Sequence, residues 1–358
     1  MECVINAKFL GQQIKGTQQV GIGLSKYLKA KIPGVQFVTT SRIIHTELAE
    51  NLLAFPIGNR NDIFWEQVDL FRFLNSKNNP LLVDFGNTAP CFYKNKISTI
   101  LDISPVLHPE WFSYKSGMYL RLITNAYIKK SKKIIAISEY TKGTIIDRYN
   151  IDSSSVEIIY PACPEIFDLG NQKYVQEIDN NICDYILAVT SMDPRKNFIG
   201  LIEAFKRANI KNLKLLIVGS QSKVFANQDF KNAISNNESI IFTGYITDEK
   251  LISLYRGALF FVYPSFFEGF GIPPLEAMIC ECPTIVSNTT SLPEVCGDAS
   301  LYIDPYKNDS LVDGIIELYN NEELRKQLKS KGIVRAKAFS WEKSAEKLAK
   351  IVNSIRSA

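Results

Sequence analysis

The chain has few of the residues that build metal centres and disulfide frameworks. It contains 2 His and 7 Cys among 358 residues, and the Cys are scattered without a Cys-x-x-Cys pair. These counts argue against a zinc site and a disulfide scaffold, and they fit reduced thiols in a cytosol. No apolar run approaches the roughly 18 residues of a membrane-spanning helix, and the start of the sequence lacks a basic signal region. We therefore expect a cytoplasmic protein, soluble or peripheral to a membrane.

Several catalytic signatures are also absent. The sequence has no Gly-x4-Gly-Lys-[Ser/Thr] phosphate loop, no Gly-x-Ser-x-Gly elbow and no His-Glu-x-x-His pair, which excludes the enzyme classes that depend on them. We expect no metal ion and no cofactor. The net charge of +4 is mild and does not indicate nucleic acid as a partner.

What is present is an ordinary globular composition, with 46% hydrophobic and 22% charged residues. The length exceeds the usual single core, so two domains are expected. Strand-like and helix-like segments alternate in both halves, which favours an α/β fold with parallel sheets. A polar stretch at 151–181, containing Pro161, Pro164 and Gly170, interrupts the alternation and predicts a linker. We expect domains at 1–165 and 166–340, with a ligand between them at the carboxyl ends of the strands.

The pattern predicts the following elements. The expected strands are 2–10, 35–39, 81–84, 97–103, 134–137, 185–189, 214–218, 240–242, 259–263 and 284–287. The expected helices are 17–31 (capped by Thr17), 60–75, 198–208, 248–256, 309–319, 322–339 and 341–355.

Residues 263–278 are the most informative stretch of the chain. An apolar strand leads into a turn with Gly269 and Gly271, and Pro273-Pro274 stand where a helix begins. The start of a helix attracts anions such as phosphate. Glu268 in the turn and Glu276, expected in the first helical turn, would repel a phosphate, so they are better suited to hydroxyl groups. Such a turn also serves geometry alone, but the constellation indicates a ligand with both phosphate and hydroxyls, such as a nucleotide sugar.

Cations for a diphosphate lie after the first strand of the second half. The segment from Ser191 contains Arg195 and Lys196 directly before a helix, where positive charges oppose the helix dipole. Arg provides a bidentate fork and Lys a point charge; the alternative is solvated surface charge. Gly219 and Gly244, at the ends of two other strands, would let a base or ribose approach.

The first half offers weaker candidates. Asp102 follows a strand and either faces the cleft or caps a turn, and His108 is either a proton-transfer group or a structural hydrogen-bonding residue. A basic run is either a solvated face or a contact for anionic lipid headgroups, through Lys129, Lys130, Lys132 and Lys133.

Taken together, these residues resemble the family-four glycosyltransferases of GT-B fold. The matching segments are 185–206, 242–255 with Gly244 and Tyr245, the Glu-x7-Glu element 268–276, 292–299 and 339–342. Residues 6–10, 16–19 and 108–112 look like a subgroup that assembles bacterial O-antigen and exopolysaccharide. The resemblance implies two Rossmann-like domains facing across a cleft, an acceptor domain at 1–165 and a nucleotide-sugar donor domain at 166–340, with 341–358 crossing back to the first domain.

The resemblance also implies roles for individual residues. Arg195 and Lys196 would bind the donor diphosphate, and Glu276 the ribose. Glu268, with the backbone of Phe270 and Gly271, would hold the transferred sugar, and the Gly16-Thr17 loop would close over the diphosphate. The implied candidates are catalytic Glu268, Asp102 and His108, and donor-binding Gly16, Thr17, Ser191, Arg195, Lys196, Gly219, Gly244, Tyr245, Gly269, Phe270, Gly271, Leu275 and Glu276.

Enzymes of this family retain anomeric configuration without a metal, and the missing Asp-x-Asp pair agrees with that. The implied reaction moves a hexose or 6-deoxyhexose from a GDP-, UDP- or dTDP-linked donor to a glycan, lipid-linked in our expectation, during surface polysaccharide biosynthesis. The chain departs from the family at Leu101, where a His commonly contacts the donor's 6-hydroxyl. We therefore favour a 6-deoxy donor or a relaxed 6-position, with His108 as a substitute ligand in the alternative. A nucleotide-sugar 2-epimerase, and an inactive or scaffold relative, are the rival readings.

Overall fold

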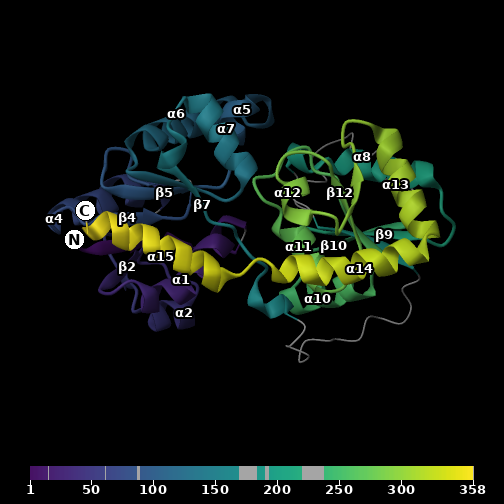
Figure 1. Cartoon of the computed structure of the whole chain (residues 1–358), viewed down its shortest axis with the longest axis horizontal. Coiled ribbons are helices and arrows are strands. Elements are labelled where there is room, and N and C mark those ends of the chain that lie inside the picture. The colour runs from purple at the N-terminus through teal and green to yellow at the C-terminus, as the bar shows by residue number, and fades with distance from the viewer. Residues whose placement is uncertain are drawn as a thin grey trace. The chain divides into compact units, whose positions relative to one another are not determined.

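The molecule is represented by a computed structural model that describes residues 1–14, 16–60, 62–86, 89–168, 184–189, 193–219 and 238–357. The chain divides into two compact units (Figure 1). Unit 1 comprises Met1–Ala162 and Ser340–Ala358, and unit 2 comprises Cys163–Phe339. The domain boundaries expected from the sequence, 165 and 341, lie within a few residues of these limits.

Unit 1 is built on a parallel sheet with the strand order β3-β2-β1-β4-β5-β6-β7. Its described strands are β1 (Cys3–Asn6), β2 (Val35–Thr39), β3 (Phe55–Pro56), β4 (Leu81–Asp84), β5 (Lys96–Ile100), β6 (Lys133–Ala136) and β7 (Val156–Ile158). Every residue of β1, β4 and β5 is buried, as expected for strands covered on both faces. The order reverses direction at β1, and right-handed crossovers then place helices on both faces of the sheet.

The helices of unit 1 connect these strands. They are η1 (Lys8–Gly11), α1 (Gly16–Lys31), α2 (Thr46–Leu52), α3 (Asp62–Phe64), η2 (Trp65–Leu70), α4 (Phe71–Ser76), α5 (Ser104–Leu107), η3 (Pro109–Trp111), α6 (Tyr114–Lys130), α7 (Glu139–Tyr149), η4 (Ser153–Ser155) and α15 (Trp341–Ser357).

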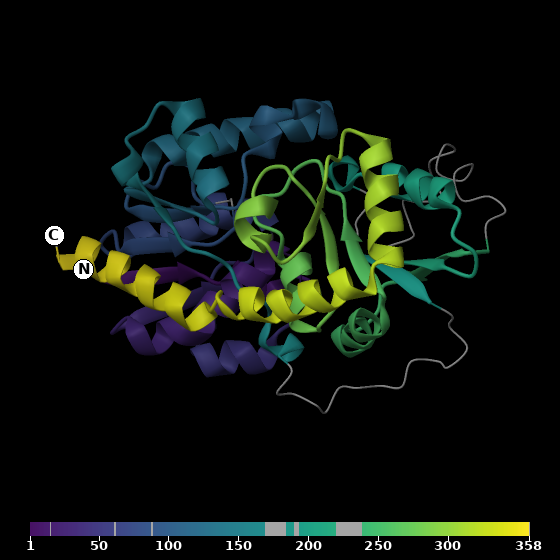
Figure 2. The same ribbon diagram turned by 45° about the vertical axis from the view of Figure 1, so that its right-hand side comes forward.

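The last helix belongs to unit 1 although it is the end of the chain. In Figures 1 and 2 the yellow α15 runs beside the purple α1. Gly23 of α1 leaves the space that the Trp341 indole fills, since a Cβ there would come within 2.3 Å of the ring. Ser344 donates a hydrogen bond to the carbonyl of Tyr160 at 2.6 Å, and Arg356 donates to that of Met1 at 2.7 Å. The prediction that the C-terminal helix returns to the first domain is confirmed.

Unit 2 repeats the architecture with the parallel order β10-β9-β8-β11-β12-β13. Its described strands are β8 (Tyr185–Val189), β9 (Lys214–Val218), β10 (Ile240–Gly244), β11 (Phe260–Tyr263), β12 (Thr284–Ser287) and β13 (Leu301–Ile303). Its described helices are η5 (Glu165–Phe167), η7 (Pro194–Lys196), α8 (Phe198–Ala208), α10 (Asp248–Gly257), α11 (Ile272–Ile279), α12 (Leu292–Cys296), α13 (Asn308–Asn320) and α14 (Glu322–Lys337). The predicted α/β class with two Rossmann-like domains is confirmed.

Five local predictions are wrong, among them the strand expected at 97–103, which ends at Ile100. The first strand ends at Asn6, and residues 8–11 form a 3-10 helix. Helix α1 begins at Gly16, so Thr17 lies in its first turn and does not cap it. The expected helix 60–75 is interrupted by a π-helix, η2. The expected linker contains β7, whose Val156 and Ile158 are buried against the sheet. This strand was not predicted, because an alternation of apolar and polar residues over only three positions cannot be distinguished from a loop.

Candidate active site

Two loops meet at the carboxyl ends of the neighbouring strands β8 and β11 in unit 2. The loop after β8 carries Asp193 to Asn197, and the loop after β11 carries the residues up to Gly271. The backbone N–H of Phe266 donates to the carbonyl of Arg195 at 2.7 Å, which joins the loops directly. Segments 71 residues apart in sequence are thereby joined as one site, at the edge where ligands bind in open α/β sheets.

Lys196 is the central cation of this site. Its Nζ donates to Glu268 Oε1 at 2.6 Å and to the Tyr263 hydroxyl at 2.7 Å, and it lies 4.9 Å from the centroid of the Tyr263 ring. The Lys196 and Glu268 side chains are 20% and 12% exposed. Burial, with the negative charge of Glu268, raises the pKa of Tyr263 well above its ordinary value, so the phenol keeps its proton. The site therefore holds a partly exposed cation whose present partner is a carboxylate.

The loop around Glu268 is held by hydroxyl groups that precede α12. The N–H of Glu268 donates to Thr290 Oγ1 at 3.2 Å. Ser291 Oγ donates to the carbonyls of Glu268 at 3.0 Å and Phe270 at 2.9 Å. Gly271 then takes φ of 109°, and a Cβ there would lie 2.7 Å from Leu292. The loop conformation therefore requires Gly at this position.

Helix α11 follows, with Gly271 as its N-cap. The first backbone N–H groups of a helix have no partner within the helix. Pro273 and Pro274 have no N–H, so the donors at this helix start are the N–H groups of Gly271 and Ile272. Glu276 is the fifth residue of the helix, and its expected place in the first turn is wrong because the helix begins at Ile272.

Glu276 is partly buried beside Tyr255 of α10. The Tyr255 hydroxyl donates to Glu276 Oε2 at 3.2 Å. Burial and the charge of Asp248 raise the pKa of Glu276 to about 8, and the hydrogen bond from Tyr255 opposes this shift. A carboxyl group in such surroundings favours a hydroxyl group over an anion as its ligand.

The other candidate donor-binding residues of unit 2 differ in their surroundings. Arg195 lies in the joined loops, and its guanidinium donates from Nε to Asp193 Oδ2 at 2.9 Å. Gly219 follows β9 and Gly244 ends the neighbouring β10, and the Gly219 N–H donates to the Gly244 carbonyl at 3.1 Å. Tyr245 is 87% exposed, whereas Leu275 and Phe270 are buried. Ser191 lies outside the described residues.

The remaining candidates belong to unit 1. Asp102 Oδ1 accepts from the Ser104 backbone N–H at 2.8 Å, which matches its reading as a turn cap. His108 Nδ1 lies 3.0 Å from Glu110 Oε1, and its ring stacks on Trp111 at 4.0 Å between centroids. Gly16 and Thr17 form the first turn of α1.

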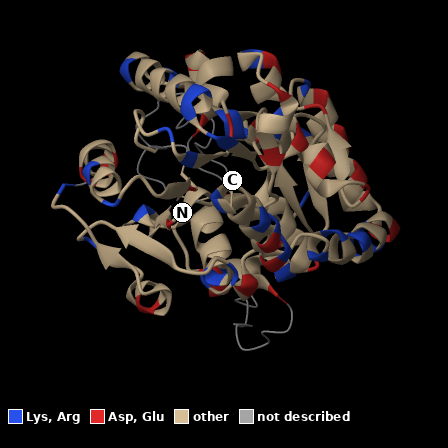
Figure 3. Ribbon diagram, turned by 60° about the vertical axis from the view of Figure 1, so that its left-hand side comes forward, with Lys and Arg blue, Asp and Glu red and all other residues tan. Residues whose placement is uncertain are grey.

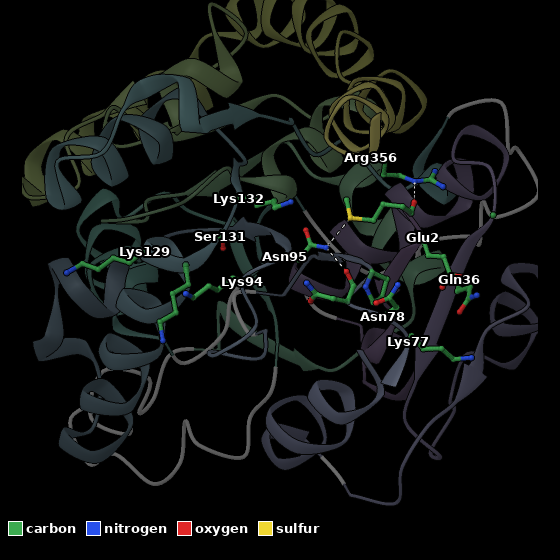
Figure 4. Close-up of a pocket in the computed structure, with 15 residues that line it drawn as sticks. Glu2, Gln36, Lys77, Asn78, Lys94, Asn95, Lys129, Ser131, Lys132 and Arg356 are labelled. Atoms are coloured by element: carbon green, nitrogen blue, oxygen red, sulfur yellow. Dashed lines mark hydrogen bonds between the residues drawn. The ribbon is translucent and has the colours of Figure 1, made fainter. Parts of the chain in front are cut away.

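The basic run divides between two environments. Lys129, Lys130 and Lys132 border a hollow of about 1360 Å³ at the amino ends of the unit 1 strands, the edge opposite to Asp102. Figure 4 shows Lys77 and Lys94 around the same hollow. Lys133 is engaged elsewhere, because its Nζ donates to the Ser154 carbonyl at 2.6 Å and lies 3.5 Å from Glu157. Contact of the four lysines with an anionic membrane stays a prediction.

The hydroxyl groups of Tyr255, Tyr263, Thr290 and Ser291 also belong to the site, and none of them is among the residues predicted from the sequence. The signal for the last two was their position between a strand and the Leu-Pro-Glu helix start. Within the residues that the structure describes, no group of three or more His, Cys, Asp or Glu is arranged for a metal ion. None of the described helices combines the length and apolarity needed to cross a bilayer.

A doubly wound pair of units with such a site is the architecture of a nucleotide-sugar transferase. The model of the family described as "Glycosyl transferases group 1" matches residues 179–335, and the chain belongs to this family of glycosyltransferases.

Curated relatives and solved structures agree. O-antigen chain mannosyltransferase B of Escherichia coli is 30% identical over 272 residues, or 72% of this chain and 71% of that enzyme. O-antigen chain mannosyltransferase RfbU of Salmonella typhimurium is 29% identical, over 63% of each chain. The crystal structure of HepE from Anabaena with UDP and glucose superposes with a TM-score of 0.75 at 16% identity, covering 99% of this chain and 100% of that one. WaaG, a glycosyltransferase involved in lipopolysaccharide biosynthesis, superposes with a TM-score of 0.73 at 15% identity, covering 98% and 99%. The latter two show the GT-B fold alone.

Proposed function

We propose that this glycosyltransferase moves a hexose or 6-deoxyhexose from a nucleotide diphosphate sugar to a lipid-linked glycan in surface polysaccharide biosynthesis, with retention and without a metal. The observation that carries the proposal is the Lys196–Glu268–Tyr263 cluster at the carboxyl ends of β8 and β11. The names of the relatives, which are O-antigen mannosyltransferases, support the polysaccharide context and make GDP-mannose the first donor to test.

Different residues of unit 2 would bind the diphosphate, the ribose and the sugar of the donor. Lys196 and Arg195, with the N–H groups of Gly271 and Ile272, would neutralise the diphosphate as charge develops on the leaving group. Glu276 would accept from the ribose hydroxyls, and Glu268 from the transferred sugar. Binding of the diphosphate would replace the Lys196–Glu268 contact by a Lys196–phosphate contact, which leaves Glu268 available for sugar hydroxyls.

Thermal unfolding in a panel of nucleotide diphosphate sugars tests the donor, because a true donor stabilises the folded chain by mass action. We expect one donor to raise the Tm and to support transfer at an undiminished rate in EDTA. NMR of the product should give the same anomeric configuration as in the donor. Loss of transfer in EDTA, or inversion, would contradict the mechanism.

The Leu101 position bears on the identity of the sugar. Leucine has no hydrogen-bonding group, and the His108 ring is already stacked on Trp111 and bonded to Glu110. These two observations support a donor without a 6-hydroxyl, or tolerance at that position. GDP-mannose and GDP-6-deoxymannose form a matched pair for the comparison. A strong preference for the 6-hydroxyl donor would refute the idea.

Contact with an anionic membrane is supported by helix α6. Its exposed apolar side chains Tyr114, Met118 and Leu122, 82%, 48% and 65% exposed, recur every fourth residue and so share one face. The helix carries Lys115, Arg121, Lys129 and Lys130 but no Asp or Glu. Elsewhere Lys and Arg are interspersed with Asp and Glu over much of the ribbon (Figure 3). An exposed face that combines apolar and basic residues suits the surface of an anionic bilayer.

Sedimentation with phosphatidylglycerol vesicles tests this contact. We expect Leu122→Glu to reduce binding and Val334→Glu, at a 73% exposed apolar position on α14, to leave it unchanged. Equal binding by both variants would remove the membrane from the proposal.

A further inference from the structure

A small polar cavity lies in unit 1 at the carboxyl ends of β1 and β4. Its volume is about 250 Å³, and its polar lining includes Asn6, Lys8, Gln18, Glu66 and Asp84. Of the residues assigned to the donor, only Thr17 lines it. The cavity is smaller than the roughly 300–1,000 Å³ of sites for drug-sized ligands, so its size suits a single sugar ring.

Two buried carboxyl groups are held together inside this cavity. Asn6 Nδ2 donates both to Asp84 Oδ1 at 2.7 Å and to Glu66 Oε1 at 3.1 Å. Lys8 Nζ lies 3.0 Å from Glu66 Oε2. Glu66 and Asp84 are each 1% exposed, and Asn6 is 4% exposed.

This arrangement is expensive for the fold. Burying carboxylates carries a large desolvation penalty that one amide and one lysine only partly offset. Glu66 also lies in the π-helix η2 (Trp65–Leu70), a rare conformation that is less favourable than an α-helix and frequent at functional sites. The fold does not need two buried acids at the carboxyl ends of β1 and β4, so the cluster points to a ligand.

The lining decides the chemistry of that ligand. Two carboxyl groups would repel a phosphate, and Lys8 beside Glu66 opposes a metal cation. Carboxylate acceptors alternate with lysine and amide donors, which is the pattern that a neutral molecule with several hydroxyls satisfies. Burial and the charge of Glu66 raise the pKa of Asp84 to about 7, so near neutrality its carboxyl group is available both as donor and as acceptor.

Gln18 adds an independent observation. Its Nε2 donates to Gln12 Oε1 at 2.9 Å, but its buried Oε1 has no hydrogen-bond partner among the described residues. A buried acceptor without a partner is costly. A sugar hydroxyl in the cavity would supply the missing donor.

We propose that this cavity binds the hydroxyl groups of the acceptor sugar, with Glu66 and Asp84 as the principal hydrogen-bonding groups. The inference rests on the transferase function proposed above, because only a transferase has an acceptor. Both residues bind and position the acceptor, and neither is assigned a bond-making step.

Kinetics of the full chain with GDP-mannose and octyl α-mannoside as acceptor probe test the proposal. We expect Glu66→Gln and Asp84→Asn, which keep the shape of each side chain, to raise the acceptor KM at least about tenfold, the effect of one lost charge-assisted hydrogen bond. The donor KM, and slow hydrolysis of the donor by water, should stay unchanged. Asp69→Asn is the matched control, because Asp69 is a buried acid on the same π-helix that pairs with Arg60 outside the cavity.

The outcomes separate this inference from the proposed function. Acceptor KM values that stay unchanged in both cavity variants, or donor and acceptor KM values that rise together, would overturn the cavity assignment while leaving transfer intact. If the wild type transfers nothing, saturation-transfer NMR with methyl α-mannoside still decides. The signal should be present for the wild type and Asp69→Asn and lost in Glu66→Gln; a wild type without signal overturns the inference.

Discussion

Both units place a lysine–glutamate pair at the carboxyl end of a parallel sheet, but the two pairs differ in exposure. In unit 2 the side chains of Lys196 and Glu268 are 20% and 12% exposed. In unit 1 those of Lys8 and Glu66 are 13% and 2% exposed, and the glutamate shares an amide with a second buried acid, Asp84. The unit 2 cation can therefore exchange its carboxylate for a charged ligand, whereas the two buried acids of the unit 1 cluster, beside a single lysine, suit a neutral ligand. On the functions proposed above, one fold provides a charged-ligand site and a polyol site from similar residues.

The sharpest test of this difference removes the unit 2 cations. Arg195→Ala with Lys196→Ala should nearly abolish turnover, because each removed contact that strengthens in the transition state is worth roughly 2–4 kcal/mol. Initial rates at saturating donor measure the loss. Lys326→Ala, an exposed lysine of α14 paired with Glu322, is the control and should retain the wild-type rate. Near-wild-type turnover of the double variant would refute the diphosphate assignment.

The next effect concerns the carboxyl group of α11. Glu276→Ala should raise the donor KM by about five- to a hundredfold, since leaving a bound ribose hydroxyl without its partner costs about 1–3 kcal/mol. Tyr255→Phe removes the hydroxyl that orients Glu276 and should produce a smaller change in the same direction. The acceptor KM should stay constant in both variants. A larger effect on acceptor than on donor would reverse the roles given to the two units.

The contrast also explains what the sequence could predict. The unit 2 site is largely local, since Glu268, Gly271 and Glu276 lie within nine consecutive residues and their turn chemistry is readable. Its partners Lys196, Thr290 and Ser291 each follow a recognisable strand. The two-unit fold was predictable for the same reason, because buried parallel strands are continuous apolar runs.

The unit 1 cluster was not predictable in this way. In the sequence, Glu66 lies 60 residues and Asp84 lies 78 residues after Asn6. The pairing of β1 with β4 brings the ends of these two strands together. Glu66 lies in a segment with the periodicity of an ordinary amphipathic helix, and this periodicity does not show that residues 65–70 form a π-helix. Neither the pairing of β1 with β4 nor the π-helix can be predicted from the local sequence pattern.

A packing comparison within unit 1 gives the third prediction. Gly23→Ala should destabilise the protein by about 1–3 kcal/mol, because the new Cβ would overlap the Trp341 ring that holds α15 on α1. Gly143→Ala on α7 meets nothing within 4 Å and should stabilise by up to about 1 kcal/mol through helix propensity. Thermal unfolding of both variants measures the difference. A stable Gly23→Ala variant would mean that α15 can separate from α1 at little cost.

The smallest expected effect is a difference in pH dependence that distinguishes the acid pair from an ordinary carboxylate. The pKa of Asp84 rises from 3.8 to about 7 in the folded chain through burial and the charge of Glu66, against the opposing effects of the Gly86 N–H, Asn6 and Lys96. The folded state then binds this proton more tightly than the unfolded state, so its contribution to stability is complete below about pH 4 and is lost as the pH rises through 7.

Asp84→Asn has no proton to lose. Between pH 5 and 7 the free energy of unfolding of the wild type should therefore fall relative to that of the variant by on the order of 1 kcal/mol per pH unit. Urea unfolding of both proteins across this range measures the difference, and Glu276, which titrates in the same direction, cancels because both proteins contain it. Parallel curves would mean that Asp84 is ionised throughout, and the pair would then be a charged site like that of unit 2.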